Sequence, residues 1–544
     1  MSVGNGWGSG NHWDYIIIGA GSAGCALANE LARGCKGQSI LVLEAGGSDR
    51  SPLIRFPAGS LKTAEFWDWG YWSQPDPSRN GAKERWDRGR VLGGCSSVNS
   101  TVFVRGARHD FDRWAKSLGG DSGERWSSSE VMPLFSELET SDQENEYRGE
   151  SGPLYVRTVR RPHLATQAFL QAAIACGYAF NEDYNGADQE GVSYAQLNQR
   201  SGLRCSSSDA FLRPLLRSGG NVTLMLNAWV RKIELRDGRA VAVQFKRDSD
   251  DCREEGRNII VCSGAINSPS LLMQSGIGDA EELVRHNIPV VLHLPEVGRH
   301  LRDHPRITMV YEAKEQTNSL TGGLLQKLGI AATYLATREG PISNIFEGVG
   351  FLRSAPSEPH PDIQLHFTPI GLAKNVESSA LAPYPSVTVV VNKNYPASSG
   401  RIRLSSNDPQ VAPLIECRLL EQEEDVDTLV RGVEKVRQIM QSEPIASLLK
   451  KETMPGGHVA TEPALRDYVR ANTEITYHFS GTCRMGTDAA SVVDAEMRVR
   501  GTENLYVADA SIMPDLISGN TNAVCMMIGK KLGRQFVTHH RLTG

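Results

Sequence analysis

The chain has 544 residues, of which 40% are hydrophobic and 22% charged, so it is too long for one ordinary core and predicts two or more globular units. The formal charge is −5 at pH 7, so no overall basic excess points to a nucleic acid or to an anionic membrane as partner. No apolar run reaches the roughly 18 residues that a transmembrane helix needs, which excludes a membrane-spanning segment.

The N-terminal residues and the cysteines indicate an enzyme of a reducing compartment. The opening MSVGNGWGSGNHW has neither the basic start nor the apolar stretch of a signal peptide, which predicts a cytoplasmic location. The 10 cysteines form no C-x-x-C pair, so neither a disulfide framework nor a metal site is predicted. The 53 glycines are more informative, because glycine lets the backbone approach a bound ligand closely.

A strand, a glycine turn, a helix and a second strand open the chain. Residues 13–19 and 39–44 are apolar runs typical of buried strands, and residues 25–33 place Leu27 and Leu31 on one helix face. Together they predict a βαβ unit, and hence an α/β fold with a parallel sheet.

The turn carries the pattern Gly19-x-Gly21-x-x-Gly24, and Glu44 ends the second strand. In a dinucleotide-binding unit the first glycine makes the turn, the second lets the backbone reach a pyrophosphate, and the third allows close packing of helix on strand. The helix N-terminus then faces the phosphates, and Glu44 can bind ribose hydroxyls. The pattern in this context favours dinucleotide binding over an ordinary glycine turn, but it does not separate FAD from NAD.

Strand and helix patterns alternate along the rest of the chain. The predicted strands are 221–245 (short strands around a turn at Asp237-Gly238), 257–263, 307–313, 362–370, 386–395 and 504–508. The three that lie between 307 and 395 show the partial alternation of an antiparallel sheet. Helical patterns cover an acidic stretch over 113–147 and a strongly amphipathic one over 423–443.

Four further segments are rich in glycine and small polar residues: 88–99, 263–278, 477–486 and 509–523. The first suits contact with a phosphate or a flavin edge, because adjacent glycines and serines offer backbone N–H groups and hydroxyls at close quarters. The second leads from a strand through small residues into a helix, which brings the chain close to a ligand at a strand's carboxyl end. The third contains His478, although a lone histidine is more often structural than catalytic.

These segments occur in the order of one known family. GRVLGGCSSVN and GAINSPSLLMQSGIG correspond to its two signature patterns, and VGRHLRDHP (297–305) and HFSGTCRMG (478–486) are close to its other motifs. From Tyr15 to Leu532 the chain resembles the glucose–methanol–choline (GMC) oxidoreductases, which are FAD enzymes. The resemblance implies a Rossmann-like α/β FAD-binding domain and an α+β substrate domain whose antiparallel sheet covers the flavin.

The resemblance also implies that both domains are discontinuous and that FAD is the dinucleotide. We expect the FAD-binding domain over 12–105, 220–306 and 470–544, and the substrate-binding domain over 106–219 and 307–469. The residues expected to contact FAD are Gly19, Gly21, Ser22, Ala23 and Gly24 (pyrophosphate), Glu44 and Ala45 (ribose), Arg90, Gly94, Asn99, Thr101 and Val102 (flavin), Val230 (adenine), Ser263 and Gly264, Asp509 and Ala510 (pyrophosphate and ribityl chain), and Asn520, Thr521 and Asn522 (flavin ring).

By the same resemblance, His478 and Asn520 are the expected catalytic pair. Oxidising an alcohol removes the hydroxyl proton and transfers a hydride from the same carbon, here to flavin N5. A neutral imidazole can take that proton at pH 7, whereas an amide can only donate a hydrogen bond to the developing alkoxide. The expected activity is therefore FAD-dependent oxidation of a primary alcohol to the aldehyde.

Val98 bears on how FAD is held. Some choline-oxidising relatives have a histidine at this position that is bonded covalently to the flavin, a bond that Val98 cannot form, so FAD is expected to be non-covalent. The His/Asn pairing is more similar to the choline oxidase and hydroxymethylfurfural oxidase branches than to glucose or aryl-alcohol oxidases. The electron acceptor stays open between O₂ and a quinone or artificial acceptor.

The substrate is indicated only by the residues expected around the open face of the flavin. These are Phe103, Ile345, Phe346, Phe367, Pro369, Ile370 and Phe479. They favour an apolar, aromatic or furanic alcohol over a polyol, because apolar walls gain affinity from buried area. Glu347, which could pair with a cation, leaves choline open. A polyol dehydrogenase and a non-redox enzyme similar to the family's hydroxynitrile lyases stay open as well.

Overall fold

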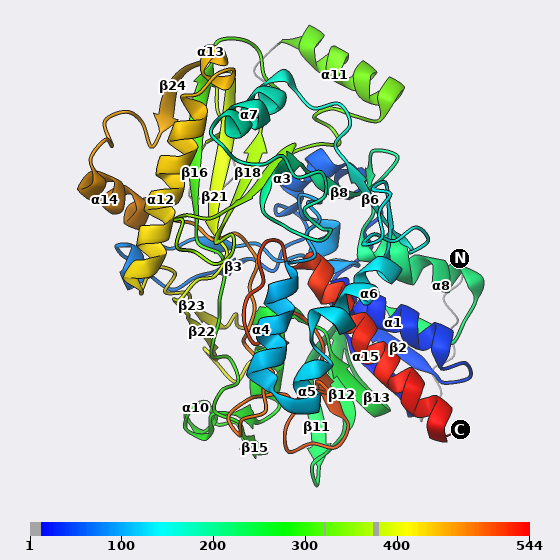
Figure 1. Ribbon diagram of the computed structural model, residues 1–544. Coiled ribbons are helices and arrows are strands. Elements are labelled where there is room, and N and C mark those ends of the chain that lie inside the picture. The colour runs from blue at the N-terminus through cyan, green and yellow to red at the C-terminus, as the bar shows by residue number, and fades with distance from the viewer. Residues whose placement is uncertain (1–11, 320–322, 374–379, 544) are drawn as a thin grey trace.

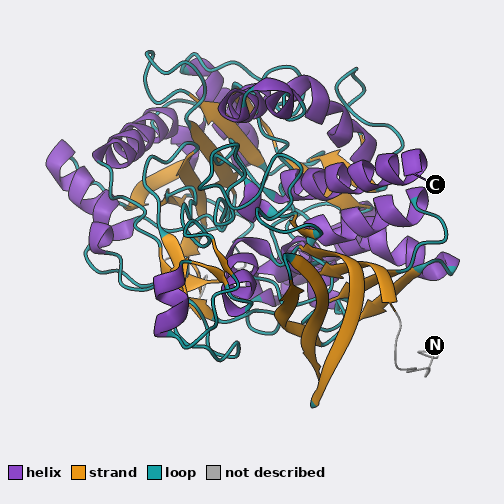
Figure 2. Cartoon of the chain, turned by 90° about the horizontal axis from the view of Figure 1, so that it is seen from below, coloured by secondary structure: helices purple, strands orange, loops and turns teal. Residues whose placement is uncertain are grey.

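The computed structural model describes residues 12–319, 323–373 and 380–543, and two large sheets organise this part of the chain (Figure 1). One sheet has seven strands and lies in the lower half of Figure 1, and the other has six strands and lies in the upper half. Figure 2 shows the seven-stranded sheet from below, where its strands curve and twist together beside the helices.

The seven-stranded sheet is parallel around its centre. β1 (His12–Ile18) pairs in parallel with β2 (Ile40–Leu43) and with β13 (Asp250–Val261), and α1 (Ser22–Gly34) connects β1 to β2. β10 (Val222–Met225) adds in parallel to β2, and β25 (Leu505–Val507) to β13. All four residues of β2 are buried, as expected for a parallel sheet covered on both faces. The predicted βαβ unit and the α/β fold class are therefore confirmed.

An antiparallel ribbon extends this sheet on one side. β11 (Ala228–Arg236) and β12 (Arg239–Arg247) form a hairpin, and β12 pairs antiparallel with the first half of β13. The strand predicted to begin at residue 257 therefore begins at Asp250. Its first half was missed because most of its side chains are polar and at least partly exposed, so only the second half carries the apolar signal.

The six-stranded sheet is antiparallel, in the order β24-β16-β21-β18-β17-β7. Its strands are β7 (Gly191–Tyr194), β16 (Arg306–Ala313), β17 (Gly348–Leu352), β18 (Ile363–Thr368), β21 (Ser386–Lys393) and β24 (Leu449–Met454). α12 (Glu423–Met440) packs against β21 and β16 through buried residues such as Val426, Leu429 and Val433. The three predicted strands and the amphipathic helix are confirmed, although the helix ends at Met440 rather than at residue 443.

The two ends of the described chain lie side by side. α15 (Asn522–Thr543), red in Figure 1, packs along α1, which is blue. A Cβ added to Gly529 would lie only 2.2 Å from the carbonyl oxygen of Ala23, so the helices approach closely at this glycine. This packing brings the last predicted motif next to the glycine turn, some 500 residues earlier, as the hydrogen bond between Ser22 and Asn522 shows.

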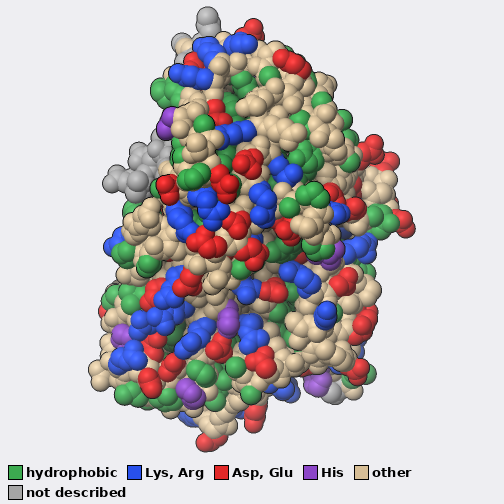
Figure 3. Space-filling view, turned by 60° about the vertical axis from the view of Figure 1, so that its left-hand side comes forward, with side chains coloured by type: hydrophobic (Ala, Val, Ile, Leu, Met, Phe, Trp, Pro, Cys, Tyr) green, Lys and Arg blue, Asp and Glu red, His purple; other side chains and the backbone are tan. Residues whose placement is uncertain are grey.

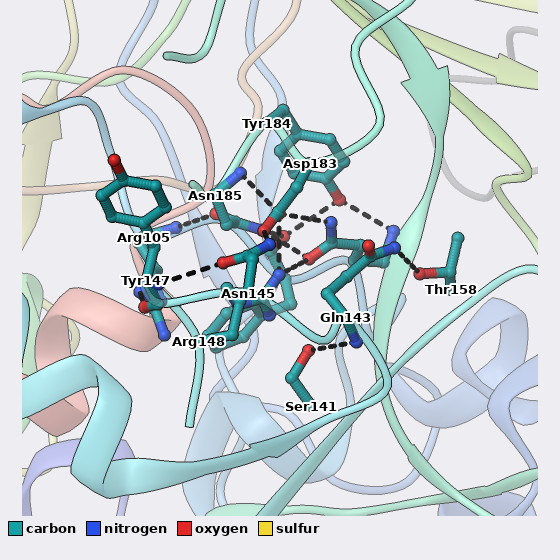
Figure 4. A network of polar contacts seen from close by, with 12 residues as sticks. Arg105, Ser141, Gln143, Asn145, Tyr147, Arg148, Thr158, Asp183, Tyr184 and Asn185 are labelled. Carbon is teal, nitrogen blue, oxygen red and sulfur yellow. Dashed lines mark hydrogen bonds and ion pairs between the residues drawn. The ribbon is translucent and has the colours of Figure 1, made fainter. Parts of the chain in front are cut away.

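The helical stretch predicted over 113–147 is only partly right. α4 (Arg108–Leu118), α5 (Gly120–Glu124) and α6 (Ser128–Leu138) are helical, but β5 (Glu139–Ser141) and a loop follow. Buried Glu139 accepts from Arg148 Nε at 2.6 Å, and Arg148 Nη1 also contacts Asp183 at 2.8 Å. Figure 4 shows this polar network, in which Arg105 and Arg148 gather around the loop of Asp183. The acidic residues past Leu138 therefore include ion-pair partners rather than an exposed helix face.

The remaining elements complete the connections. The α-helices are α2 (Pro52–Arg55), α3 (Ser60–Thr63), α7 (Leu164–Ala175), α8 (Arg213–Ser218), α9 (Gly264–Gln274), α10 (Ala280–Arg285), α11 (Leu324–Thr337), α13 (Ile445–Leu448) and α14 (Glu462–Asn472). The 3-10 helices are η1 (Pro57–Gly59), η2 (Pro77–Arg79), η3 (Gly94–Ser97) and η5 (Ala510–Ile512), and η4 (Ser208–Leu212) is a π-helix. The strands are β3 (Tyr71–Trp72), β4 (Arg85–Trp86), β6 (Leu154–Thr158), β8 (Gln196–Arg200), β9 (Leu203–Arg204), β14 (Ile277–Gly278), β15 (Leu292–His293), β19 (Leu372–Ala373), β20 (Ala380–Leu381), β22 (Arg401–Arg403) and β23 (Leu414–Glu416).

The sheets follow the predicted division of the chain. Every strand of the seven-stranded sheet lies within 12–105, 220–306 or 470–544, and every strand of the other sheet lies in the remaining segments, apart from Arg306 at the start of β16. The domain boundaries themselves stay a prediction. Figure 3 shows basic and acidic side chains interspersed on one face of the molecule. In the described parts of the chain, no helix has the length and apolar character needed to cross a bilayer.

Candidate functional site

A cavity of about 680 Å³ lies at the carboxyl ends of the parallel strands. Its wall includes Gly19 after β1, Glu44 after β2, Ser263 after β13 and Asp509 after β25. The predicted site residues that line it are Gly19, Gly21, Ser22, Ala23, Glu44, Ala45, Arg90, Gly94, Asn99, Thr101, Val102, Val230, Ser263, Gly264, His478, Asp509, Ala510, Asn520, Thr521 and Asn522. The fold therefore brings together all but one of the expected catalytic and cofactor-binding residues, and the exception is Gly24.

The three glycines of the turn have different surroundings. Gly19 has a φ of +105°, which favours glycine, and a Cβ there would lie 2.5 Å from the carbonyl oxygen of Cys262. A Cβ on Gly21 would meet nothing within 4 Å, because this residue faces the open cavity. A Cβ on Gly24 would lie 2.0 Å from the carbonyl oxygen of Gly19, so Gly24 serves helix packing. These are the roles expected of a dinucleotide turn.

Two buried carboxylates hold the backbone around the cavity. Glu44 accepts from the N–H of Ala20 at 2.9 Å and of Gly46 at 2.8 Å, and burial raises its pKa to about 7. Asp509 accepts from the N–H of Gly264 at 2.8 Å and from Ser268 Oγ at 2.6 Å. Asp509 thereby joins the motif at 509–523 to the motif at 263–278, and both line the cavity.

The segment 88–102 forms another wall. A Cβ on Gly94 would lie 2.9 Å from Gly21 Cα, so the two glycine segments are in close contact. Asn99 Oδ1 accepts from Arg204 Nη1 at 2.7 Å, and Thr101 adopts a φ of +66°. The guanidinium of Arg90 lies 4.8 Å from the ring centre of Trp69. The segment is thus shaped by specific contacts, several of them between residues that line the cavity.

His478 and Asn520 meet inside the cavity. Asn520 Nδ2 lies 2.9 Å from His478 Nε2, and Gln364 Nε2 donates to Asn520 Oδ1 at 3.3 Å. Because Gln364 uses the amide oxygen of Asn520, the amide nitrogen is the atom that faces the imidazole and donates to it. His478 Nε2 is therefore an unprotonated acceptor, as a base must be before reaction.

His304, which the sequence did not single out, fixes the other side of this imidazole. His304 Nε2 lies 2.9 Å from the carbonyl oxygen of Ile517, which can only accept, so this nitrogen carries the proton. His304 Nδ1 is then an acceptor, and it lies 2.9 Å from His478 Nδ1, which must donate. This series of hydrogen bonds leaves the lone pair of His478 on Nε2, the atom that faces Asn520.

Asp303 fixes the backbone that carries His478. Its carboxylate accepts from the N–H groups of Thr476 at 2.9 Å, Tyr477 at 3.0 Å and His478 at 2.7 Å. Burial raises the pKa of Asp303 to about 7. The motifs VGRHLRDHP and HFSGTCRMG therefore act together, one supplying the residues that hold the other.

The electrostatics keep His478 neutral. Burial lowers its pKa well below the usual 6.5, and His304, His366, Arg88 and Arg306 lower it further. His366 lines the same cavity from β18, and burial lowers its pKa to about 3. The Nδ1 atom of His366 is buried and has no hydrogen-bond partner among the described residues. The cavity wall thus contains two neutral imidazoles, together with the two arginines.

Only some of the apolar residues expected around the cavity line it in the structure. Ile345, Phe346 and Phe479 line it, whereas Phe103, Phe367, Pro369 and Ile370 do not. Successive residues of a strand point to opposite faces, so His366 enters the cavity and Phe367 packs on Phe169, with ring centres 4.5 Å apart. The sequence could have indicated this alternation within 362–370, but not which face is toward the cavity.

Glu347 also lies outside the cavity wall. Its carboxylate accepts from the N–H of His163 and from Thr166 Oγ1, both at 2.7 Å, and burial raises its pKa to about 7. Glu347 therefore caps the start of α7 and is not placed to meet a substrate cation.

The residues present fit FAD. The glycine turn at the N-terminus of α1, the buried acid after β2 and the two glycine-rich walls match what a dinucleotide requires. Val98 lines the cavity and offers no atom for a covalent link to a flavin.

Comparisons with known proteins agree with this site. The model of the GMC oxidoreductase N-terminal domain matches residues 13–306, and that of the C-terminal domain matches 396–529. The chain is 36% identical to the alcohol dehydrogenase [acceptor] of Pseudomonas putida over 95% of this chain and 94% of that one. It is 37% identical to the oxygen-dependent choline dehydrogenase of Rhizobium meliloti over 96% of both chains.

Two solved structures have the same fold as this chain. Pyridoxine 4-oxidase from Mesorbium loti superposes with a TM-score of 0.87 at 26% identity, covering 97% of this chain and 99% of that one. A fungal aryl-alcohol oxidase shares the fold at 22% identity with a TM-score of 0.83, over 97% and 99% of the two chains. The chain therefore belongs to the GMC oxidoreductase family, whose members are FAD-dependent enzymes.

Proposed function

We propose that the protein oxidises an apolar or aromatic primary alcohol to the aldehyde, with His478 as the base and FAD held without a covalent bond. The observation that carries this proposal is the His478–Asn520 pair, 2.9 Å apart in the cavity, with the lone pair of Nε2 facing the amide. When bound, FAD supplies the hydride acceptor.

The chain's own residues handle the proton. His478 Nε2 accepts the hydroxyl proton, and the resulting imidazolium keeps its Nδ1–H bond to His304. Asn520 has a second N–H beyond the one that contacts His478, and it can donate this to the alkoxide oxygen. Burial of His478 excludes water from the base, which favours transfer from the substrate over exchange with solvent.

The walls beside the pair support an apolar substrate. Ile345, Phe346, Leu372 and Val390 line the cavity together with His478. They offer apolar area and no hydroxyl or carboxylate to satisfy the several OH groups of a sugar or polyol. His366 adds one neutral hydrogen-bonding group, which is compatible with a single ring heteroatom.

Choline is the second candidate, because a choline dehydrogenase is among the relatives. Two of the charged groups that act on His478, Arg88 and Arg306, are positive, and they would repel a quaternary ammonium beside the base. Glu347, the acid considered as a partner for the cation, bonds to α7 instead. These contacts favour a neutral alcohol over choline.

A panel of alcohols tests the substrate. With an artificial electron acceptor, benzyl and furfuryl alcohols should exceed glucose, glycerol and choline in kcat/KM by at least about tenfold, which corresponds to about 1.4 kcal/mol. A sugar, polyol or choline at the top of the panel would overturn the substrate proposal. The same assay with O₂ and with a soluble quinone in place of the artificial acceptor decides between these natural acceptors.

A non-redox reaction is tested separately. If the enzyme acted as a hydroxynitrile-lyase-like protein, it would release aldehyde from a cyanohydrin and no alcohol would reduce its flavin. We expect the opposite result, because both positions of the catalytic pair are occupied by residues suited to alcohol oxidation.

A further inference from the structure

Gln364 reaches the His478–Asn520 pair from the six-stranded sheet. Its Nε2 atom donates to Oδ1 of Asn520 at 3.3 Å, across 156 residues of sequence. Successive residues of β18 point to opposite faces, so Gln364 shares its face with His366, which lines the cavity, while Phe367 packs on α7 from the other face. Gln364 itself is fully buried and is not part of the cavity wall.

The main chain beside Asn520 is fixed by other contacts. The N–H and Oγ of Ser518 donate to Oδ2 of Asp110 at 2.9 Å and 2.7 Å. Gly519 has a φ of +84°, and a Cβ there would lie 2.7 Å from the side chain of Val104. These contacts determine where Asn520 begins, but they do not touch its amide. Which end of the amide faces His478 is therefore decided by the groups that bond to the amide itself.

Only one orientation of this amide fits the imidazole. The carbonyl of Ile517 and the ring of His304 leave Nε2 of His478 as an acceptor. The amide nitrogen of Asn520 can donate to it at 2.9 Å, whereas the amide oxygen in the same place would set two acceptors against each other. Oδ1 of Asn520 has to face the other way, toward Gln364, and Nε2 of Gln364 supplies the donor that it needs.

Asn392 holds Gln364 in the matching orientation. The two residues lie opposite each other in the register of β18 and β21, neighbouring strands in Figure 1, and both are fully buried. Nδ2 of Asn392 donates to Oε1 of Gln364 at 3.4 Å, which leaves the amide nitrogen of Gln364 for Asn520. The hydrogen bonds therefore run in one direction, from Asn392 through Gln364 and Asn520 to His478. Packing alone would be served by a leucine at position 364, because a buried amide is costly unless it is hydrogen-bonded.

We propose that Gln364 is a positioning residue, which keeps the amide nitrogen of Asn520 turned toward His478. This role rests on the proposed function, because it affects the reaction only if the His478–Asn520 pair acts on an alcohol. In that reaction the same nitrogen donates its second N–H to the alkoxide, whereas a reversed amide would present its oxygen to the alkoxide and repel it. Loss of Gln364 should therefore slow the chemical step without removing a group that touches the substrate.

A double-mutant cycle tests the proposal with the FAD-loaded enzyme and the alcohol that gives the highest wild-type rate. Gln364→Leu removes both polar ends of the side chain and keeps much of its volume. It should lower kcat about tenfold with little change in KM, which is less than the about 10²- to 10³-fold loss expected when a donor to the alkoxide is itself removed. In an Asn520→Ala background no amide remains to be oriented, so Gln364→Leu should change kcat there by less than about twofold.

Two further variants complete the cycle. Asn392→Ala removes only the donor to Gln364 and should cause a smaller loss of kcat that likewise disappears in the Asn520→Ala background. Gln189→Leu is the matched control, because Gln189 is also buried and its amide has no hydrogen-bond partner among the described residues. The control should leave kcat and KM unchanged. The melting temperature and the FAD spectrum of each variant show whether it is folded.

Two results would overturn the positioning role and leave the proposed function standing. The first is a folded Gln364→Leu enzyme whose kcat lies within about twofold of the wild-type value. The second is an equal loss in both backgrounds, which would mean that Gln364 stabilises the structure independently of Asn520. A wild-type enzyme that oxidises no alcohol of the panel would instead overturn the proposed function, and the role of Gln364 with it.

Discussion

Nδ1 of His304 and Nδ1 of His478 lie 2.9 Å apart, and the carbonyl of Ile517 on the far side of His304 determines which of them carries the proton. His304 must accept and His478 must donate, which leaves the lone pair of His478 on Nε2, where Asn520 Nδ2 donates to it. In the proposed mechanism this lone pair takes the proton from the substrate. If His478 is the base, as we propose, His304 is a positioning residue that acts on the reaction through the tautomer of His478.

Replacing His304 tests this positioning role. His304→Ala should lower kcat about 10- to 100-fold with a smaller change in KM, because His478 can then adopt the wrong tautomer. His304→Asn keeps an acceptor oxygen near the position of Nδ1 and should recover part of kcat. Steady-state kinetics of both variants, with the FAD spectrum as a check on folding, make the measurement. If both variants changed KM equally and left kcat unchanged, the positioning role of His304 would be contradicted.

The pH dependence follows from the lowered pKa of His478. A base is active when neutral, so a pKa well below 6.5 predicts that kcat/KM is constant from pH 6.5 upward to pH 8 and falls only below this range. A wild-type profile whose acid limb lies at or above pH 6.5 would show that His478 is not the neutral base described.

Two glycines of the turn give a matched pair of variants. A methyl group on Gly21 has room but enters the cavity, so Gly21→Ala should fold normally and bind FAD more weakly. A methyl group on Gly24 would clash with the backbone of Gly19, so Gly24→Ala should destabilise the apoprotein by about 1–3 kcal/mol. Thermal unfolding of both apoproteins and titration with FAD measure the two effects. Reversed outcomes would mean that the cofactor lies elsewhere.

Attachment of FAD is decided by acid precipitation. Val98 has no atom that can bond to the flavin, so the supernatant should be yellow and the pellet colourless. A yellow pellet that survives washing would show a covalent link at another residue.

Much of the cavity could be predicted from the sequence because the glycine motifs act locally. The Gly19–Gly24 pattern, the acid at Glu44 and the segment 263–278 each follow a strand, and the carboxyl ends of parallel strands meet at one edge of a sheet. Knowing the strands was therefore enough to gather most of the expected cofactor-binding residues, and the family resemblance gave each its expected role.

The substrate side could not be predicted in the same way. Phe367 and His366 are neighbours in sequence, and only the packing of Phe367 on Phe169 decides that the histidine faces the cavity. The roles of His304 and Glu347 could not be predicted for a similar reason. Their partners, His478 and Thr166, are 174 and 181 residues away in the sequence. Contacts over such distances depend on tertiary structure, which residue spacing does not encode.

The reaction of FAD with alcohol under anaerobic conditions tests the central claim most directly. Benzyl alcohol should bleach the flavin absorbance of the wild-type enzyme, and His478→Ala should keep its yellow spectrum while bleaching about 10²- to 10⁴-fold more slowly, because the base is lost. A wild-type flavin that no alcohol in the panel can bleach, or a His478→Ala variant that bleaches within about twofold of the wild-type rate, would contradict alcohol oxidation through His478.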